Sequence, residues 1–303
     1  MKILMTGGTG FVGSRLTGAL CEDGHRLTVL TRSVRPDRAL PSGAVFLEAD
    51  PTEPGPWQEQ VPEHDLLINL AGASIFQRWT DKAKKRMRES RLRTTRNLVD
   101  ALAGSEKGGS IRLLNTSAVG YYGFAGDEIL TEESPPGDDF LAVLARDWER
   151  EALRAGTAGA RVTILRFGVV LGGREGALAK MVPLFKKYLG GPLGSGDQWF
   201  PWIHIQDLVS VYRFLMDRPD LEGPLNCTAP QPVRNRELTR ALAGALEKPA
   251  FMPPVPGFVI RAVLGEFGNV LLKGQRVIPE RLIREGFAFR YPAIEEALND
   301  LVG

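Results

Sequence analysis

The sequence predicts an α/β fold, a doubly wound parallel sheet followed by a smaller C-terminal lobe, on three observations. A short apolar run begins almost at the first residue, over Lys2 to Thr6, and is typical of a buried central strand. A glycine-rich turn follows, and apolar residues then recur at helical spacing from Val12 to Leu20. Further apolar runs alternate with helical stretches as far as Cys227. This order predicts a Rossmann-like sheet with a substrate lobe appended to it.

Size and composition indicate an ordinary globular protein of about two domains, or of one domain and a lobe. The chain has 303 residues, of which 43% are hydrophobic and 24% charged. Its net charge of +2 predicts neither a nucleic acid nor a membrane as partner. No apolar run is long enough for a membrane span, and the first strand does not resemble a signal peptide, so a cytoplasmic location is expected. Cys21 and Cys227 lack metal-type spacing, which predicts reduced packing residues and no metal site.

The turn after the first strand carries three glycines, spaced Gly7-x-x-Gly10-x-x-Gly13. The first permits a tight turn, the second lets a diphosphate approach the backbone, and the third lets helix and strand pack closely. Free N–H groups and the positive dipole end of the helix favour the same ligand. The turn therefore predicts a dinucleotide site. Its predicted contact residues are Gly7, Thr9, Gly10, Phe11 and Val12.

The run Thr6-Gly7-Gly8-Thr9-Gly10-Phe11-Val12-Gly13 resembles the T-G-G-x-G-F-[IV]-G opening of the extended short-chain dehydrogenase/reductase family. That family includes the nucleotide-sugar epimerases and dehydratases. The resemblance recurs along roughly the first 230 residues. It implies a nicotinamide dinucleotide as cofactor.

The second strand, Arg26 to Thr31, ends where such sites bind the adenosine ribose. An acidic residue there would accept hydrogen bonds from the ribose and would repel a 2′-phosphate. This chain has Thr31 and Arg32 instead, with Arg35 and Arg38 close behind. Because arginine offers phosphate a planar, permanently charged group, Thr31 and Arg32 predict NADP(H) in preference to NAD(H). A solvated basic loop is the alternative interpretation.

Three further segments resemble parts of the family's cofactor site. Small residues follow the fourth strand at Leu70-Ala71-Gly72 and would let a dinucleotide lie across the edge of the sheet. The resemblance implies a diphosphate contact from Arg91, on a helix expected over residues 80–102, and a nicotinamide contact near Val170. It also suggests that Asp50 binds the adenine amine. A solvated charge run for Arg91 and a turn beside Pro51 for Asp50 are the alternatives.

The fifth strand runs into Ser117-Ala118-Val119-Gly120-Tyr121-Tyr122-Gly123, which resembles the family's S-S-x-x-V-Y-G. A Ser or Thr of that motif polarises the substrate in the family. Here Ala118 occupies the matching position, and Ser117 stands one residue early. We expect Ser117 and Tyr121 to be the catalytic residues, because they are the hydroxyls that the sequence places at this edge.

The family's acid/base pair, Tyr-x-x-x-Lys on the next helix, is missing. The matching positions are Phe140 and Leu144, neither of which can transfer a proton. Farther on, Arg166 is expected to be a structural ion-pair partner and His204 a hydrogen-bonded structural histidine. A turn-rich, aromatic stretch at 190–202 either lines a substrate pocket or fills the lobe interface.

The chain divides by sequence into three parts. Residues 1–172 form the predicted NADP-binding core, to which segments of 204–230 return, residues 173–248 mix core and substrate lobe, and residues 249–303 form a helical C-terminal lobe. Asp207 and Asn235 are expected to cap the helices that follow them. In the last part the sequence predicts helices over 258–272, 279–285 and 294–301 and a strand over 286–289. Residues 51–62 are expected to be mostly loop.

The whole set of motifs resembles an atypical branch of the extended reductases, the epimerase-family group labelled cell-division-inhibitor-like (SDR39U-type). Besides the runs quoted above, the resemblance rests on Arg78-Trp79, Ser90-Arg91, Asp147-Trp148-Glu149, Phe200-Pro201-Trp202-Ile203-His204 and Gly274-Gln275-Arg276-Val277-Ile278-Pro279. It implies an NADP(H)-binding protein without an established substrate. Two functions therefore stay open: an oxidoreductase or epimerase acting on a small hydroxyl or carbonyl compound, and a non-catalytic NADP(H)-binding regulator.

Overall fold

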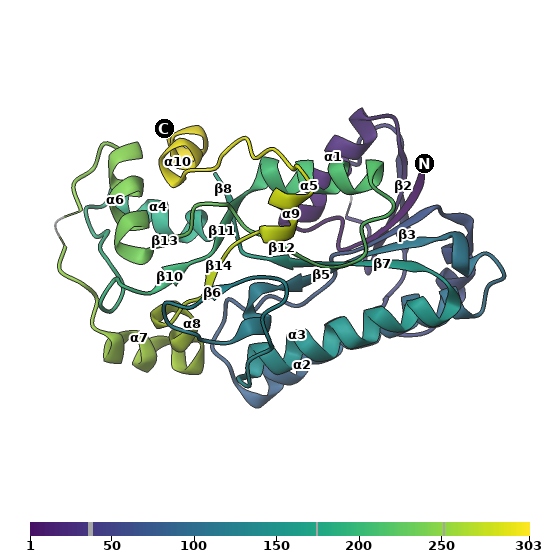
Figure 1. The fold of residues 1–303 in the computed structure, drawn as a ribbon, viewed down its shortest axis with the longest axis horizontal. Helices are drawn as coiled ribbons and strands as arrows, with labels where there is room; N and C mark the ends of the chain where they lie inside the picture. Colours follow the sequence, from purple (N-terminus) through teal and green to yellow (C-terminus); the bar gives the residue numbers. More distant parts are fainter. Residues whose placement is uncertain (36–38, 174, 251) are drawn as a thin grey trace.

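Seven parallel strands form the main sheet of the computed structural model, which describes residues 1–35, 39–173, 175–250 and 252–303. The strands lie in the order β12-β7-β5-β4-β1-β2-β3 (Figure 1). Their bounds are β1 (Lys2–Thr6), β2 (Arg26–Thr31), β3 (Ala44–Glu48), β4 (Leu66–Asn69), β5 (Arg112–Ala118), β7 (Arg161–Phe167) and β12 (Gly223–Cys227). The strand order reverses direction beside β1, as in a doubly wound sheet. The predicted Rossmann-like fold is confirmed.

Helices cover both faces of this sheet. In Figure 1, α1 (Phe11–Glu22) and α5 (Ile205–Asp217) lie above it, and α2 (Asp81–Ala103) and α3 (Phe140–Leu153) lie below it. Short 3₁₀ helices complete the core: η1 (Pro56–Glu63), η2 (Gly108–Ser110), η3 (Val119–Tyr122) and η4 (Arg154–Ala158). Among the described residues, no helix is both long and apolar enough to cross a bilayer.

The first strand is apolar on both faces because both faces are buried. Ile3 and Met5 belong to the cluster that contains Leu16 of α1. Leu4 points to the opposite side and joins the cluster of Leu98 on α2. Each such side chain stabilises the fold by about 1.5–3 kcal/mol when fully buried. The period of two along the strand thus fixes which helix packs on which face.

The lobe is built from short strands and small helices, at the left in Figure 1. Three small sheets cross it: β11-β8-β9, β10-β13 and β14-β6. Their strands are β6 (Ile129–Leu130), β8 (Val169–Gly172), β9 (Glu175–Gly176), β10 (Trp199–Phe200), β11 (Trp202–His204), β13 (Val233–Arg234) and β14 (Arg276–Val277). The helices of this part are α4 (Leu178–Lys186) and α6 (Asn235–Ala245).

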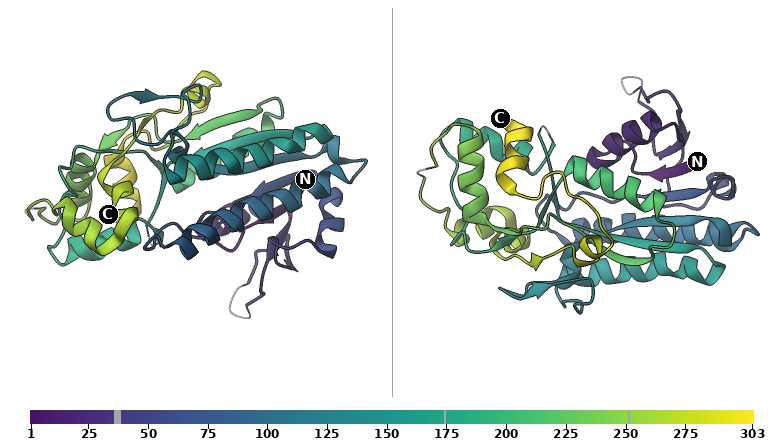
Figure 2. Two further views of the ribbon diagram at one scale, coloured as in Figure 1. Left: turned by 90° about the horizontal axis from the view of Figure 1, so that it is seen from below. Right: turned by 45° about the horizontal axis from the view of Figure 1, so that its top comes forward.

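The C-terminal segment is distributed along the molecule. It contains α7 (Gly257–Leu264), η5 (Gly265–Phe267), α8 (Gly268–Leu272), α9 (Glu280–Arg284) and α10 (Ile294–Val302). The helix α10 packs on α6 (Figure 2, right). In addition, α9 packs on β12, and β14 pairs with β6. The segment therefore joins the lobe to the core sheet.

Three predictions about the chain's secondary structure were wrong. The helix expected over 258–272 is divided at Gly265, which has φ +63° and ends α7. Residues 286–289 form no strand, and Phe287 and Phe289 pack instead against the core. The segment expected to be mostly loop contains η1, in which Gln58 Oε1 accepts a hydrogen bond from the Gly55 N–H at 3.0 Å.

Both predicted helix caps were also wrong. α5 begins at Ile205, and its cap is His204, whose Nδ1 accepts a hydrogen bond from the Gln206 N–H at 3.1 Å. Asp207 is buried inside α5 and accepts backbone hydrogen bonds from Arg290 and Tyr291 at 2.8 and 3.0 Å. In α6 the cap position is Arg234, and the Asn235 Oδ1 accepts from the Leu193 N–H at 2.8 Å. Both side chains hold loops from distant parts of the sequence.

Candidate functional site

The three glycines of the first turn have different surroundings. Gly7 has φ +71°, and a Cβ there would lie 2.8 Å from the Leu70 carbonyl carbon. A Cβ on Gly13 would lie 2.2 Å from the Gly7 carbonyl oxygen. On Gly10, by contrast, a Cβ would meet only the Gly7 oxygen, at 3.3 Å. Packing within the protein therefore requires Gly7 and Gly13, whereas Gly10 faces open space before the N-terminus of α1.

Buried hydrogen bonds support the sheet edge beneath this turn. The Thr6 hydroxyl donates to Asn69 Oδ1 at 2.6 Å, and the Asn69 amide donates to Asn115 at 2.6 Å and to Thr95 at 2.8 Å. The Ala71 N–H donates in turn to the Thr6 hydroxyl at 3.3 Å. The bonds connect β1, β4, β5 and α2, and they hold the predicted segment Leu70-Ala71-Gly72 beside the glycine turn.

Arg91 reaches this edge from α2. Its Nη1 donates to the carbonyls of Ala73 and Met87, both at 3.0 Å, and a Cβ on Gly72 would lie 2.9 Å from its Cζ. Burial lowers the pKa of Arg91 to about 10. Within the described ranges no carboxylate forms an ion pair with it, and its charge is stabilised by the two carbonyls and by the Trp148 ring, whose centroid lies 5.2 Å from its Cζ. An anion at the glycine turn is the natural partner for such a charge.

The end of β2 is the part of the site that faces solvent most openly. Arg32 is exposed and, in the part of the chain that the structure describes, makes no hydrogen bond or ion pair. The Thr31 hydroxyl donates to the Ser33 carbonyl at 3.3 Å. Arg38 lies outside the described residues. The exposed Asp50 accepts hydrogen bonds from the N–H and hydroxyl of Thr52, at 2.9 and 2.7 Å. These bonds form a turn, which was the alternative to adenine binding for Asp50.

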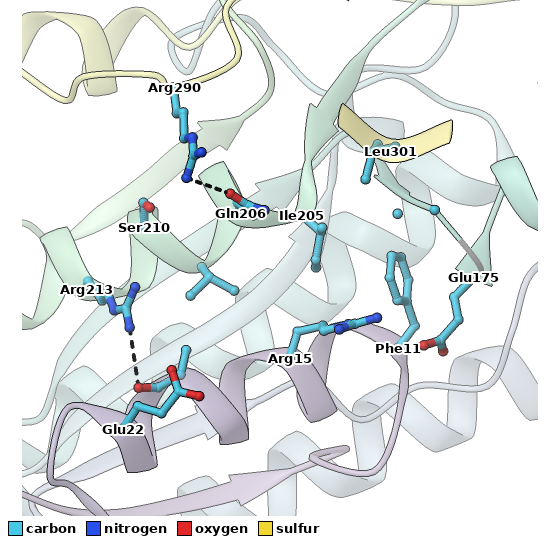
Figure 3. A pocket seen from close by; sticks show the side chains of 14 residues that line it. Phe11, Arg15, Glu22, Glu175, Ile205, Gln206, Ser210, Arg213, Arg290 and Leu301 are labelled. Atoms are coloured by element: carbon cyan, nitrogen blue, oxygen red, sulfur yellow. Dashed lines mark hydrogen bonds between the residues drawn. The ribbon is translucent and has the colours of Figure 1, made fainter. Parts of the chain in front are cut away.

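Phe11, the first residue of α1, connects the turn to the β8–β9 hairpin. A Cβ on Gly172 would lie 2.5 Å from the Phe11 ring, and one on Gly176 would lie 3.1 Å from it. Val170, the predicted nicotinamide contact, belongs to that hairpin. Behind the ring lies a pocket of about 390 Å³ between α1, α5 and the hairpin (Figure 3). Arg15 and Glu175 line the pocket in that view.

The two predicted catalytic residues both contact the same buried ion pair. Arg166 binds Glu149 through two hydrogen bonds, of 2.9 and 2.8 Å. The Ser117 hydroxyl is buried and donates to the same carboxylate at 2.6 Å. The ring of Tyr121 stacks on the guanidinium, whose Cζ lies 3.5 Å from the ring centroid. The structure therefore brings Ser117 and Tyr121 together, and it confirms Arg166 as an ion-pair partner.

Sequence reasoning missed the remaining members of this buried cluster. The Tyr122 hydroxyl accepts a hydrogen bond from Arg166 at 2.9 Å and donates to Asn226 at 2.7 Å. Burial raises the pKa of Tyr122 to about 12, although Arg166 opposes the shift. Glu132 accepts the Asn226 N–H at 2.9 Å, and burial raises the pKa of this carboxyl. No sequence signal separates Tyr122 from Tyr121, because their roles depend on which side of η3 each faces.

A model described as the NAD dependent epimerase/dehydratase family matches residues 3–227. The chain belongs to that family. A second model, a domain of unknown function (DUF1731), matches residues 255–301 of this family member.

Relatives of similar length place the chain more closely within the epimerase/dehydratase family. It is 40% identical to "Epimerase family protein SDR39U1 homolog, chloroplastic" of Arabidopsis thaliana, over 100% of this chain and 87% of the relative. It is 38% identical to "Epimerase family protein YfhF" of Bacillus subtilis, over 100% and 98%. The crystal structure of human epimerase family protein SDR39U1 with NADPH superposes with a TM-score of 0.87 at 34% identity, covering 100% of this chain and 99% of that one. The resemblance to the atypical SDR39U-type branch is confirmed.

This family member uses the usual tyrosine and lysine positions for packing. Phe140 lies edge-on to Trp79, with ring centroids 5.2 Å apart. Leu144 is buried in the same cluster, which also contains Ala83 and Met87 of α2. Both positions thus lie against α2, and a proton donor at either of them would have to displace apolar side chains.

The surroundings of His204 show that this residue has a structural role. His204 stacks on Tyr291 with centroids 3.9 Å apart, and its Nε2 lies 3.2 Å from Asp300. Burial lowers the pKa of His204 to about 4, although Asp300 opposes the shift. It is therefore a structural histidine, as predicted. In the described ranges no three His, Cys, Asp or Glu side chains are grouped as metal ligands would be.

Proposed function

We propose that the chain is an NADP(H)-dependent oxidoreductase or epimerase that acts on a small hydroxyl or carbonyl compound. Two observations at the same sheet edge carry the proposal: the open space at Gly10, and the Arg91 guanidinium at Gly72, which has no carboxylate partner among the described residues. A diphosphate fits this position by shape and by charge. The NADPH present in the human relative's structure supports the same assignment.

The residues that would hold the cofactor follow the edge of the sheet. The backbone of Gly7, Thr9, Gly10, Phe11 and Val12 would bind the diphosphate at the N-terminus of α1, and Arg91 would neutralise it from α2. Thr31 and Arg32 would bind a 2′-phosphate. Leu70, Ala71, Gly72 and Val170 would form the surface on which the rest of the dinucleotide lies. The exposed position of Arg32 supports the preference for NADP(H).

When bound, the nicotinamide supplies the hydride chemistry. The chain must then orient the substrate carbon and move a proton. We assign the proton to Tyr121, because the hydroxyl of Ser117 already donates to Glu149 in a buried site. Arg166 holds the Tyr121 ring by stacking, and Glu149 holds Arg166 in turn. Ser117 then supports this arrangement as a positioning residue, and a proton from Ser117 itself is the second possibility.

The non-catalytic regulator remains the second candidate. The observation that favours it is the apolar packing of Phe140 and Leu144, where the family's acid/base pair would act. A regulator would bind NADPH and oxidise none of it. We expect calorimetry to show tighter binding of NADPH than of NADH in either case.

A panel of aldehydes, ketones and quinones separates the two functions. We expect at least one carbonyl to oxidise NADPH in the presence of the protein, with the rate lost in Tyr121→Phe. Binding without oxidation of any member would favour the regulator. Absence of NADPH binding would refute both.

A further inference from the structure

Helix α7 is apolar in sequence and yet mostly uncovered. Six of its eight residues, Gly257–Leu264, are apolar side chains, and Ile260 is the buried one among them. Phe258 is 70% exposed and Val263 66% exposed, and Val259 is 37% exposed. Phe258 and Val259 share a stripe with the residues four positions later, so these side chains lie together on the outer face. In Figure 1 this helix lies at the periphery of the lobe.

A loop from the core contacts η5 at the C-terminal end of this helix. Phe76 is 45% exposed, and its ring lies edge-on to Phe267 with centroids 5.8 Å apart. Arg78 lies beside Gly265, since a Cβ there would meet the Arg78 side chain at 3.5 Å. Gly265 and Phe267 belong to η5, which directly continues α7. Phe76 and Arg78 therefore border the helix.

The charges around the stripe are mainly positive and unpaired. Arg78 and Arg261 are exposed and, in the described ranges, take part in no ion pair. Glu266 on η5 is neutralised by an ion pair with Lys84. We use the name α7 surface for Phe76, Arg78, Phe258, Val259, Arg261 and Val263.

We propose that the α7 surface binds the anionic face of a lipid bilayer. Exposed apolar side chains beside unpaired cations are the combination that an anionic lipid interface accepts, with the rings among the acyl chains and the cations at the headgroups. A stable protein interface needs roughly 800 Å² on each partner, contributed by about 20–30 residues. Two helical turns and two loop residues fall well short of that size. Lipid binding needs only a few inserted side chains, and we expect it to be weak and reversible.

The net charge of the chain predicts no membrane partner, but the charge that a bilayer would meet is a local one. A total of +2 describes the whole chain, whereas a bilayer would meet only the residues of one face. It is independent of the proposed reaction, because neither Tyr121 nor the glycine turn belongs to the α7 surface.

Co-sedimentation with vesicles tests the proposal. The wild-type protein is mixed at low ionic strength with vesicles of phosphatidylcholine alone, or with one third phosphatidylglycerol. We expect sedimentation only with the anionic vesicles and its loss at high salt. Phe258→Ser with Val263→Ser should lower the partition coefficient tenfold or more, because two exposed apolar groups no longer enter the lipid. Arg78→Glu with Arg261→Glu should abolish sedimentation.

Matched controls lie elsewhere on the surface. Val45→Ser removes an apolar side chain that is 62% exposed on β3, and Arg240→Glu reverses an exposed charge on α6; neither should change sedimentation. Failure of the wild type to bind phosphatidylglycerol vesicles would overturn the proposal. Full binding by the Phe258→Ser, Val263→Ser variant would overturn it as well. So would a wild-type dimer in light scattering that this variant dissociates, since the surface would then belong to a second copy.

Discussion

The guanidinium of Arg166 lies 3.5 Å from the ring centroid of Tyr121 and is itself fixed by two hydrogen bonds to Glu149. The family's tyrosine and lysine occupy one helix, whereas this pair joins η3 to β7. Burial alone would lower the pKa of Arg166, but the bonds and charge of Glu149 raise it, so the guanidinium stays charged. The protein thus keeps a tyrosine beside a fixed cation at the end of the sheet, although the Tyr-x-x-x-Lys positions are apolar.

Loss of the Tyr121 hydroxyl should remove most of any reductase activity. Removal of one general acid lowers the rate about 10²–10⁴-fold, and Tyr121→Phe keeps the ring that stacks on Arg166. We expect this loss in kcat for whichever carbonyl the panel identifies, with unchanged NADPH affinity. Ser117→Ala should also slow the reaction, because it frees one oxygen of Glu149. Full activity in both variants would assign the proton to water or to the loop of His204.

Charge reversal at Arg32 should separate the two cofactors. A lost charge-assisted phosphate contact costs about 1.5–3 kcal/mol, so Arg32→Asp should weaken NADPH roughly tenfold to a hundredfold and spare NADH. Arg26→Asp is the matched control, since Arg26 is exposed at the opposite end of the same strand. Calorimetry that gives the wild type equal affinity for both cofactors would contradict the prediction.

Replacement of Arg91 should weaken the binding of both cofactors and should not discriminate between them. Its guanidinium lies at Gly72 rather than at the end of β2, so it would contact the diphosphate that both cofactors share. We expect Arg91→Met to weaken NADPH and NADH by similar factors, of about tenfold or more. A loss confined to NADPH would place Arg91 at the 2′-phosphate instead. Thermal unfolding in the absence of cofactor measures the separate effect of losing the bonds to Ala73 and Met87.

The sheet could be predicted from the sequence because its signals are local. The apolar runs of β1 and β4 are continuous since both faces of these strands are buried, and the glycine spacing depends on contacts within a few residues. Arg26–Thr31 was predicted to the residue for the same reason.

The buried cluster and the helix caps could not be predicted because their partners are distant along the chain. Ser117 and Glu149 are 32 residues apart, and Asp207 and Tyr291 are 84 apart. An Asp before a helical run has the pattern of a cap whether it accepts from its own helix or from another loop. Only the fold determines which donor is close.

A side chain at Gly10 should abolish cofactor binding without unfolding the protein. The Cβ of the new side chain in Gly10→Val meets only the Gly7 oxygen, at 3.3 Å, so we expect circular dichroism and melting temperature to change little. The added side chain would occupy the space of the diphosphate. Gly13→Ala is the contrasting variant, because its Cβ would overlap the Gly7 oxygen and should destabilise the fold. Normal NADPH binding by Gly10→Val would show that this glycine is only a turn residue.

The buried His204 should make the protein less stable in mild acid. Burial lowers its pKa in the folded state from 6.5 to about 4, so the unfolded chain binds a proton more readily. Stability from the neutral ring is present above pH 6.5 and is lost as the pH falls toward 4, by about 3 kcal/mol in all. His204→Asn removes the titration and keeps an acceptor for the Gln206 N–H. Urea unfolding at pH 7.5 and pH 5 should therefore show a smaller decrease for the variant than for the wild type. Equal decreases in both proteins would mean that another group determines the pH dependence, such as His64, whose pKa burial also lowers.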